Sequence, residues 1–278
     1  MKRILVPLDP SDHARAATDV ACRLAGSLGA EVTGLTVLDL EGIDHAVALP
    51  MRADLRRYPP AKAVELARES KAVLEEVQAR FNDQCRAHGV ASHLVAAGGS
   101  PAAEIMDEAR FHDLAVMGLR SHFHFATSEE PGDTLEKVVS HSPAPLLLVP
   151  EHGELPPPSR AVIAFDGSAP ATRALHHFVP LATTWKAEIR LVAAHFGEKE
   201  ATHLLDCAAG YLESHGLGPV EKVSLPESIL SAFTGSLTDW AEVAAIGTSS
   251  KSYVEKFLVG SLPRKLIASF DRPIFVHP

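Results

Sequence analysis

Glycine and serine residues near the C-terminus have the types and the spacing that suit a phosphate group. Gly247 closes the apolar run VAAIG, and Gly260-Ser261 stands directly before LPRKLIASF, a predicted helix. The N-terminus of a helix presents unpaired N–H groups and a partial positive charge, so anions bind there. Glycine allows the backbone to approach a ligand closely, and a serine hydroxyl adds a donor. The stretch 246–266 therefore predicts either a phosphate site or a plain strand-to-helix connection rich in small residues.

Other polar residues are candidate partners of such a site. Asp166 ends the apolar run RAVIAFD, where its carboxylate suits a ribose or a phosphate-bound Mg²⁺; the alternative is that it caps the next helix. His122 and His124, with Glu129 or Glu130, have the types of metal ligands, but incidental histidines are the better interpretation in a chain that has 15 of them. The sequence contains no nucleophile elbow, Walker-type Gly-Lys-Ser/Thr or recognisable carboxylate pair. We predict a binding site without catalytic residues and without a resident metal.

The elements that position these residues occur twice along the chain. The paired segments are RILVPLD (3–9) and RAVIAFD (160–166), VTGLTVL (32–38) and IRLVAA (189–194), LAVMG (114–118) and VAAIG (243–247), and GDTLEKVVSHSPAPLLLVP (132–150) and GSLPRKLIASFDRPIFVHP (260–278). A repeat of this length predicts two copies of one domain. We place the domains at 1–150 and 160–278, with a proline-rich linker at 151–159.

Each copy alternates apolar runs with segments of helical periodicity. Runs that are apolar on both sides are typical of parallel strands covered on both faces, so we expect two α/β domains in tandem, each a doubly wound, Rossmann-like sheet of about five strands. Ligands of such sheets bind beyond the carboxyl ends of the strands, where Asp9, Asp166, Gly118 and Gly247 are expected. The first copy is longer, and we expect much of the excess at 39–62. A lid, a partner surface and an interdomain clasp all remain open for that segment.

Composition excludes several classes of protein. The chain has 278 residues, of which 46% are hydrophobic and 22% charged, a globular balance. Its apolar runs are too short to span a membrane, and Asp9 interrupts the N-terminus too early for a signal peptide, so we expect a cytoplasmic protein with no membrane partner. The net charge of −9 disfavours a nucleic-acid partner.

The cysteines predict no covalent framework. Cys22, Cys85 and Cys207 are odd in number and scattered, so neither a disulfide set nor a zinc motif is indicated. Each lies in a segment of helical character, and we expect each to be a small buried hydrophobic residue.

The opening FDGSAPATRAL (165–175) and the ending with a glycine motif, a helix and a Pro-apolar strand resemble the universal stress protein family, over nearly the whole chain and twice. The resemblance implies an adenine-nucleotide alpha-hydrolase-like fold and ATP, with Mg²⁺, bound to the second copy. Nucleotide-binding members carry Gly-x2-Gly-x9-Gly-Ser/Thr. The residues implied here are Gly247, Ser250, Gly260, Ser261 and Leu262 for the phosphates, and Ala164, Phe165, Asp166 and Ala194 for the adenosine.

The two copies depart from the family pattern to different degrees. The second reads Gly247-x2-Ser250-x9-Gly260-Ser261, and a serine in left-handed conformation costs on the order of 1 kcal/mol, which weakens a site without abolishing it. The first reads Gly118-x2-Ser121-x10-Gly132-Asp133 and opens with LDPSD. Asp133, with Glu129 and Glu130 nearby, is expected to repel phosphate, since like charges ~4 Å apart cost roughly 4 kcal/mol near a surface. We predict a degenerate first copy that binds no ATP.

The resulting hypothesis is a stress-response protein that binds ATP in its C-terminal domain and acts by changing conformation or partners rather than by turnover. Two alternatives stay open: a nucleotide-free structural or interaction protein of the same family, and a slow ATP hydrolase. The resemblance also implies that LLLVP and IFVHP pair the two domains within one chain, and that the chain is able to form a homodimer.

Overall fold

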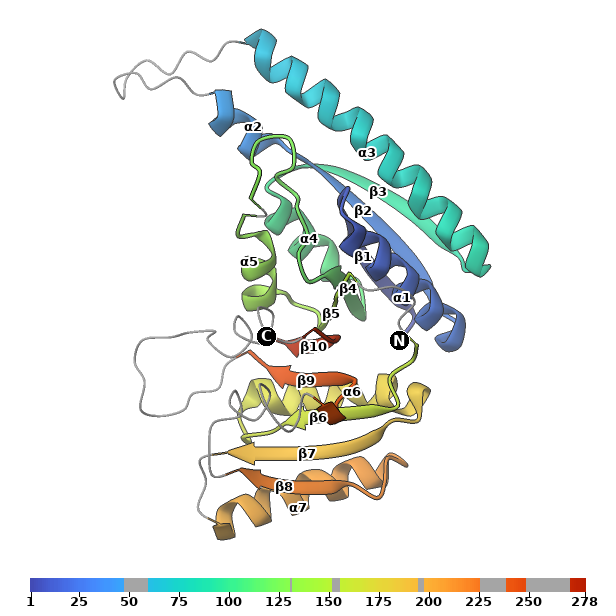
Figure 1. Cartoon of the computed structure of the whole chain (residues 1–278), viewed down its shortest axis with the longest axis vertical. Helices are drawn as coiled ribbons and strands as arrows, with labels where there is room; N and C mark the ends of the chain where they lie inside the picture. The colour runs from blue at the N-terminus through green and yellow to red at the C-terminus, as the bar shows by residue number, and fades with distance from the viewer. Residues whose placement is uncertain (48–59, 131, 152–155, 195–197, 226–238, 249–270) are drawn as a thin grey trace, which may run out of the picture. The chain divides into compact units, whose positions relative to one another are not determined.

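Two compact units make up the chain, Met1–Val138 and Val139–Pro278 (Figure 1). The computed structural model describes residues 1–47, 60–130, 132–151, 156–194, 198–225, 239–248 and 271–278. Both units combine helices with a mostly parallel sheet, so the predicted α/β class is confirmed. Within the described ranges, no helix is long and apolar enough to cross a bilayer.

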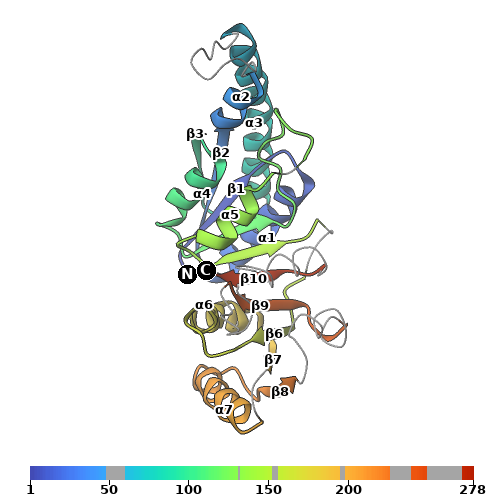
Figure 2. The same ribbon diagram turned by 90° about the vertical axis from the view of Figure 1, so that its left-hand side faces the viewer.

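The first unit has the strand order β3-β2-β1-β4, with every neighbouring pair parallel. Its strands are β1 (Arg3–Leu8), β2 (Glu31–Asp39), β3 (Ser92–Gly99) and β4 (Leu114–Gly118). Its helices are α1 (Asp12–Leu28), α2 (Leu40–Val47), α3 (Pro60–His88), α4 (Pro101–Ala109) and the start of α5 (Thr134–His141). Helices α1 and α3 pack on each other over one face of the sheet, and α4 covers the other (Figure 2). Strands β1 and β4 are therefore buried on both sides, as the unbroken apolar runs predict.

The second unit repeats this strand order. Strands β8-β7-β6-β9 correspond to β3-β2-β1-β4 and are again parallel. Its strands are β5 (Leu146–Val149), β6 (Arg160–Ala164), β7 (Glu188–Ala194), β8 (Glu221–Leu225), β9 (Val243–Gly247) and β10 (Ile274–His277). The described helices are α6 (Ala169–Trp185) and α7 (Glu198–Ser214).

Strand β5 belongs to the second unit, although it precedes the proline-rich linker. It pairs with β10 in antiparallel register, with Leu147 opposite Phe275, and both residues are buried. The two compact units meet along the chain at Val138/Val139, so β5 and β10 fall in the same unit.

The extra length of the first copy lies between β2 and β3. Helix α2 follows β2 directly, and α3 has 29 residues where α7, its counterpart, has 17. The excess therefore extends past the expected segment 39–62 into the body of α3, while residues 48–59 lie outside the described part of the chain. Since α3 packs on α1 and β2, it forms part of the covering layer of the sheet.

A chain of hydrogen bonds orients the ring of a buried histidine in the first unit. The Nδ1 atom of His112 lies 2.9 Å from the carbonyl oxygen of Glu108, and its Nε2 atom lies 2.9 Å from Oγ1 of Thr33, which is 3.0 Å from Nε2 of His93. A carbonyl only accepts, so Nδ1 of His112 carries the hydrogen and Nε2 accepts from the Thr33 hydroxyl. Burial lowers the pKa of His112 below its ordinary value of 6.5.

Acidification should therefore destabilise the first unit. Below pH 6.5 the unfolded chain binds a proton at His112 more readily than the folded state does. The free energy of unfolding therefore falls as the pH drops below 6.5. Urea unfolding at pH 7.5 and 5.5, followed by hydrogen exchange of first-unit peptides, measures the effect. His112→Gln should reduce the loss between the two pH values. An equal loss in the wild type and the variant would assign the pH dependence to other groups.

Candidate functional site

The carboxyl ends of β6, β7 and β9 bring the predicted residues of the second unit to one edge. Asp166 follows the end of β6, Ala194 ends β7 and Gly247 ends β9, and β6 lies between the other two strands. Ala164 and Phe165, at the same end of β6, are buried. The remaining predicted residues, Ser250, Gly260, Ser261 and Leu262, lie outside the described part of the chain.

Asp166 uses one carboxylate oxygen to shape the turn into α6. Its Oδ1 accepts a hydrogen bond from the Ser168 N–H at 2.9 Å, and Gly167 makes the turn at a φ of 71°, a conformation that glycine favours. The helix cap is Ser168, whose Oγ accepts from the Ala171 N–H at 3.3 Å, so the alternative that Asp166 itself caps α6 is wrong. Among the described residues, Oδ2 of this half-buried Asp166 has no hydrogen-bond partner.

Glycine at the end of β9 has a packing role that the sequence pattern did not reveal. A Cβ on Gly247 would lie 2.5 Å from the Ala171 nitrogen and from the Pro170 carbonyl carbon, both backbone atoms of α6. Gly118, at the end of β4, repeats the arrangement, with a Cβ position 2.5 Å from Cβ and 2.9 Å from the carbonyl carbon of His13 in α1. Close packing of strand and helix thus requires glycine at both positions, whether or not phosphate binds.

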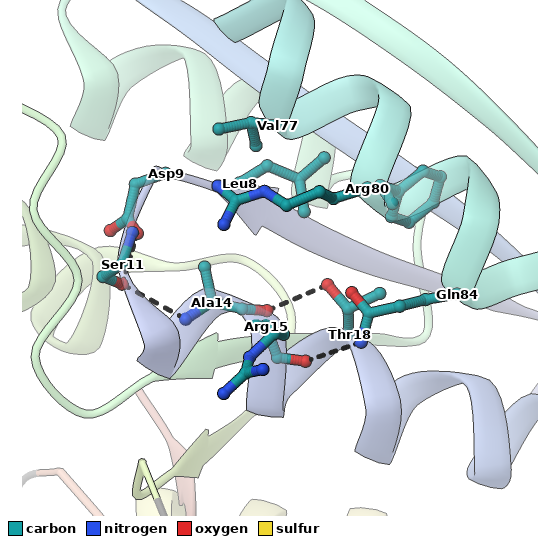
Figure 3. A pocket seen from close by; sticks show the side chains of 10 residues that line it. Leu8, Asp9, Ser11, Ala14, Arg15, Thr18, Val77, Arg80 and Gln84 are labelled. Carbon is teal, nitrogen blue, oxygen red and sulfur yellow. Dashed lines mark hydrogen bonds between the residues drawn. The ribbon is translucent and has the colours of Figure 1, made fainter. Parts of the chain in front are cut away.

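The corresponding edge of the first unit is occupied by the protein itself. Asp9 is 1% exposed, and its Oδ1 accepts from the N–H of Ser11 at 2.8 Å and from the Ser11 hydroxyl (Figure 3). Its Oδ2 accepts from the backbone N–H of His122, in the loop after β4. Both oxygens of Asp9 therefore accept hydrogen bonds, whereas among the described residues only Oδ1 of Asp166 does. The hollow drawn in Figure 3 lies between α1 and α3, and Arg15 and Arg80 are among the residues that line it.

The loop after β4 forms a plug, which we define as residues 121–124. Phe123 is 2% exposed, and Ser121 donates its hydroxyl hydrogen to the Gly118 carbonyl at 3.0 Å. Nδ1 of His124 lies 2.7 Å from Oδ2 of Asp39, which ends β2, and its Nε2 lies 3.0 Å from Oγ1 of Thr134, which starts α5. The plug therefore ties together the ends of β1, β2 and β4 and the start of α5.

Gly132 shows how tightly the plug fits. It has a φ of 73°, and a Cβ at this position would collide with the imidazole ring of His124. Gly132 corresponds in the repeat to Gly260, the glycine that opens the predicted phosphate seat of the second copy. In the first copy, the imidazole ring of His124 lies next to the glycine at this position.

Comparison with known proteins identifies the family. The model of the universal stress protein family matches residues 1–150. The chain belongs to the universal stress protein family. No curated protein matched the sequence.

Two solved structures share the fold over both units. One from Archaeoglobus fulgidus DSM 4304 is 19% identical, with 99% of this chain and 97% of that chain covered and a TM-score of 0.74. A putative universal stress protein from Pseudomonas aeruginosa UCBPP-PA14 is 18% identical, with 100% and 93% covered and a TM-score of 0.59. A universal stress protein solved in complex with cAMP is 20% identical, with 43% and 95% covered and a TM-score of 0.37.

Asp133, the residue expected to repel phosphate in the first copy of this universal stress protein, has a basic neighbour. Its side chain is 59% exposed and forms an ion pair with Lys137, with an Oδ1–Nζ distance of 2.9 Å. Charge repulsion from Asp133 is therefore partly neutralised, and Glu129 and Glu130 are exposed. What fills this edge of the first unit is the plug.

Sequence reasoning noticed His122 and His124 but missed their role. Both ring nitrogens of His124 make hydrogen bonds within the unit, and Nε2 of His122 lies 3.0 Å from the Ser128 carbonyl oxygen. A large apolar residue, Phe123, between polar neighbours was the available signal, because a phenylalanine in a polar loop gains most by burial. Asp39, the hydrogen-bond partner of His124, is distant in sequence, and nothing in its surrounding sequence predicted this contact.

Proposed function

We propose that this universal stress protein binds ATP, with Mg²⁺, in its C-terminal domain (160–278) and acts by changing conformation or partners rather than by turnover. The observation that carries the proposal is the contrast between two equivalent aspartates. Asp9 has both carboxylate oxygens occupied by its own chain, whereas Oδ2 of Asp166 has no partner among the described residues. A half-buried carboxylate oxygen at the carboxyl edge of a parallel sheet suits a ribose hydroxyl or a Mg²⁺ ion.

The ligand roles proposed for the second edge follow from position. Buried Ala164 and Phe165, with Ala194 at the end of β7, offer an apolar wall for an adenine or ribose ring. The backbone N–H groups of Gly260, Ser261 and Leu262, with Ser250 nearby, would hold the phosphates. Their spacing, Gly247-x2-Ser250-x9-Gly260-Ser261, supports this assignment.

We also propose that residues 160–278 are a second universal stress protein domain. The strand order β8-β7-β6-β9, which repeats β3-β2-β1-β4, supports this tandem arrangement. Pairing of the two domains within one chain, a homodimer and a cytoplasmic location belong to the same proposal. The net charge of −9 supports the view that nucleic acid is not a partner.

Titration of the full chain with Mg-ATP, by calorimetry, tests the proposal. We expect one nucleotide per chain at micromolar affinity, about 8 kcal/mol. Gly260→Asp should abolish binding, because the new side chain would block the close approach of the backbone to the phosphate and its carboxylate would repel the phosphate charge. Asp133→Ser is the matched control at the equivalent edge of the first unit and should leave one site, since the plug remains.

The alternatives predict other outcomes of the same measurement. The absence of binding heat up to millimolar Mg-ATP would refute the proposal and favour a nucleotide-free interaction protein. The plug at the carboxyl edge of the first unit supports this alternative for the first unit. Phosphate release faster than about one per minute, still far below the ~10 per second of typical enzymes, would favour the slow hydrolase.

A further inference from the structure

Two cysteines that are far apart in sequence meet inside the first unit. Cys22 lies in α1 and Cys85 in α3, 63 positions apart in the sequence, and their Sγ atoms are 3.5 Å apart. Both residues are buried, at 0% and 1% exposure. A disulfide has an S–S length of about 2.0 Å, so a small approach of two packed helices would bring the sulfurs to bonding distance.

The surroundings distinguish the two sulfurs. The hydrogen bond between the thiols raises the pKa of Cys22 and lowers the pKa of Cys85, while burial acts to raise the pKa of both. A hydrogen bond from Ser92 also lowers the pKa of Cys85, whereas the nearby carboxylate of Asp19 raises that of Cys22. Cys85 is therefore the better thiolate and Cys22 the proton donor. The thiolate is the nucleophilic form of cysteine.

We propose that Cys22 and Cys85 form a reversible oxidation site whose substrate is a hydroperoxide. The Cys85 thiolate attacks the peroxide oxygen, the O–O bond breaks, and Cys85 becomes a sulfenic acid while the leaving oxygen departs as water or alcohol after protonation. The Cys22 sulfur then attacks the Cys85 sulfur, and the S–O bond breaks. The departing hydroxide takes the Cys22 proton as water. Two thiols and one hydroperoxide thus give one disulfide, with the two electrons passing to the peroxide.

The position of Cys85 allows a small oxidant to reach it. Cys85 lies in the last turn of α3, which ends at His88, and terminal turns of helices fray. The side chain of His88 is hydrogen-bonded to Asp19 at 2.8 Å, at the surface of the unit. We place the route of the oxidant at this turn, because its opening would break the hydrogen bond from the Val90 N–H to the Cys85 carbonyl and expose the buried Cys85 sulfur.

Thiol counting on the full-length protein tests the proposal. The reduced protein is treated with hydrogen peroxide, quenched, unfolded and labelled with a maleimide, and the labels are counted by intact mass. The number of free thiols should fall from three to one, with Cys207 left free. Proteolysis should yield one peptide pair joined through Cys22 and Cys85, and dithiothreitol should restore all three thiols.

Variants separate the two steps. Cys85→Ser should form no disulfide. In Cys22→Ser, the sulfenic acid should persist on Cys85 and be trapped by dimedone. Cys207→Ser is the matched control: it removes the exposed thiol and should lose both remaining thiols to the disulfide.

Two results would overturn the proposal. One is retention of the Cys22 and Cys85 thiols under peroxide that oxidises Cys207, and the other is a disulfide that includes Cys207. Both are read on the wild-type protein, so poor folding of a variant leaves the test intact.

Discussion

Alanine in place of Gly247 should destabilise the second unit by about 2–3 kcal/mol, the cost of overpacking a close-packed interior. The new Cβ would lie 2.5 Å from two backbone atoms of α6, and a backbone cannot move aside as the end of a side chain can. Strand β9 is held between β10 and β6, so the strand cannot retreat either. Asp166 precedes the same helix, and we therefore expect Mg-ATP affinity to fall as well.

Urea unfolding followed by tryptophan fluorescence measures this effect directly. Both tryptophans of the chain, Trp185 and Trp240, lie in the second unit, so the signal reports that unit. Gly210→Ala in α7 is the matched control: no atom lies within 4 Å of its Cβ position, and alanine should stabilise the helix by about 0.5–1 kcal/mol. If Gly247→Ala proved as stable as Gly210→Ala, packing against α6 would not be the reason for this glycine.

Phe123→Ala should destabilise the first unit by about 3–4 kcal/mol, the usual cost of emptying a buried phenylalanine site. Phe123 is the apolar centre of the plug, and its removal also frees His124 to leave Asp39 and Thr134. The carboxyl edge of the first unit would then open to solvent.

Hydrogen exchange of peptides covering 114–138 measures the change, because this unit contains no tryptophan. Phe111→Ala is the matched control: the same substitution at a side chain that is 67% exposed should change stability by no more than about 0.5 kcal/mol. Equal protection of the segment in the two variants would show that Phe123 does not hold the plug in place.

Much of the fold was predictable because its signals are local. Unbroken apolar runs indicated parallel strands covered on both faces, and the internal repeat indicated one strand order used twice. Asp9, Asp166, Gly118 and Gly247 were correctly placed at strand ends, because a residue's place along a strand follows from neighbours in sequence. The packing role of the two glycines was not predictable from the sequence, because the atoms they must avoid belong to a helix near the start of each copy.

The sequence by itself determined the α/β class, the repeated strand order and the strand ends at which a ligand site would lie. Only the tertiary structure decided what fills the carboxyl edge of the sheet in the first unit. His124 contacts Asp39, 85 positions away in the sequence, and Cys22 contacts Cys85, 63 positions away. Strand β5 precedes the linker but pairs with β10 at the end of the chain. Such contacts depend on which helix or loop packs over which strand, and packing selects partners by shape and burial rather than by spacing along the chain. Residue types could therefore suggest a phosphate seat, but not that one of the two edges is closed by a phenylalanine and a histidine of the same chain.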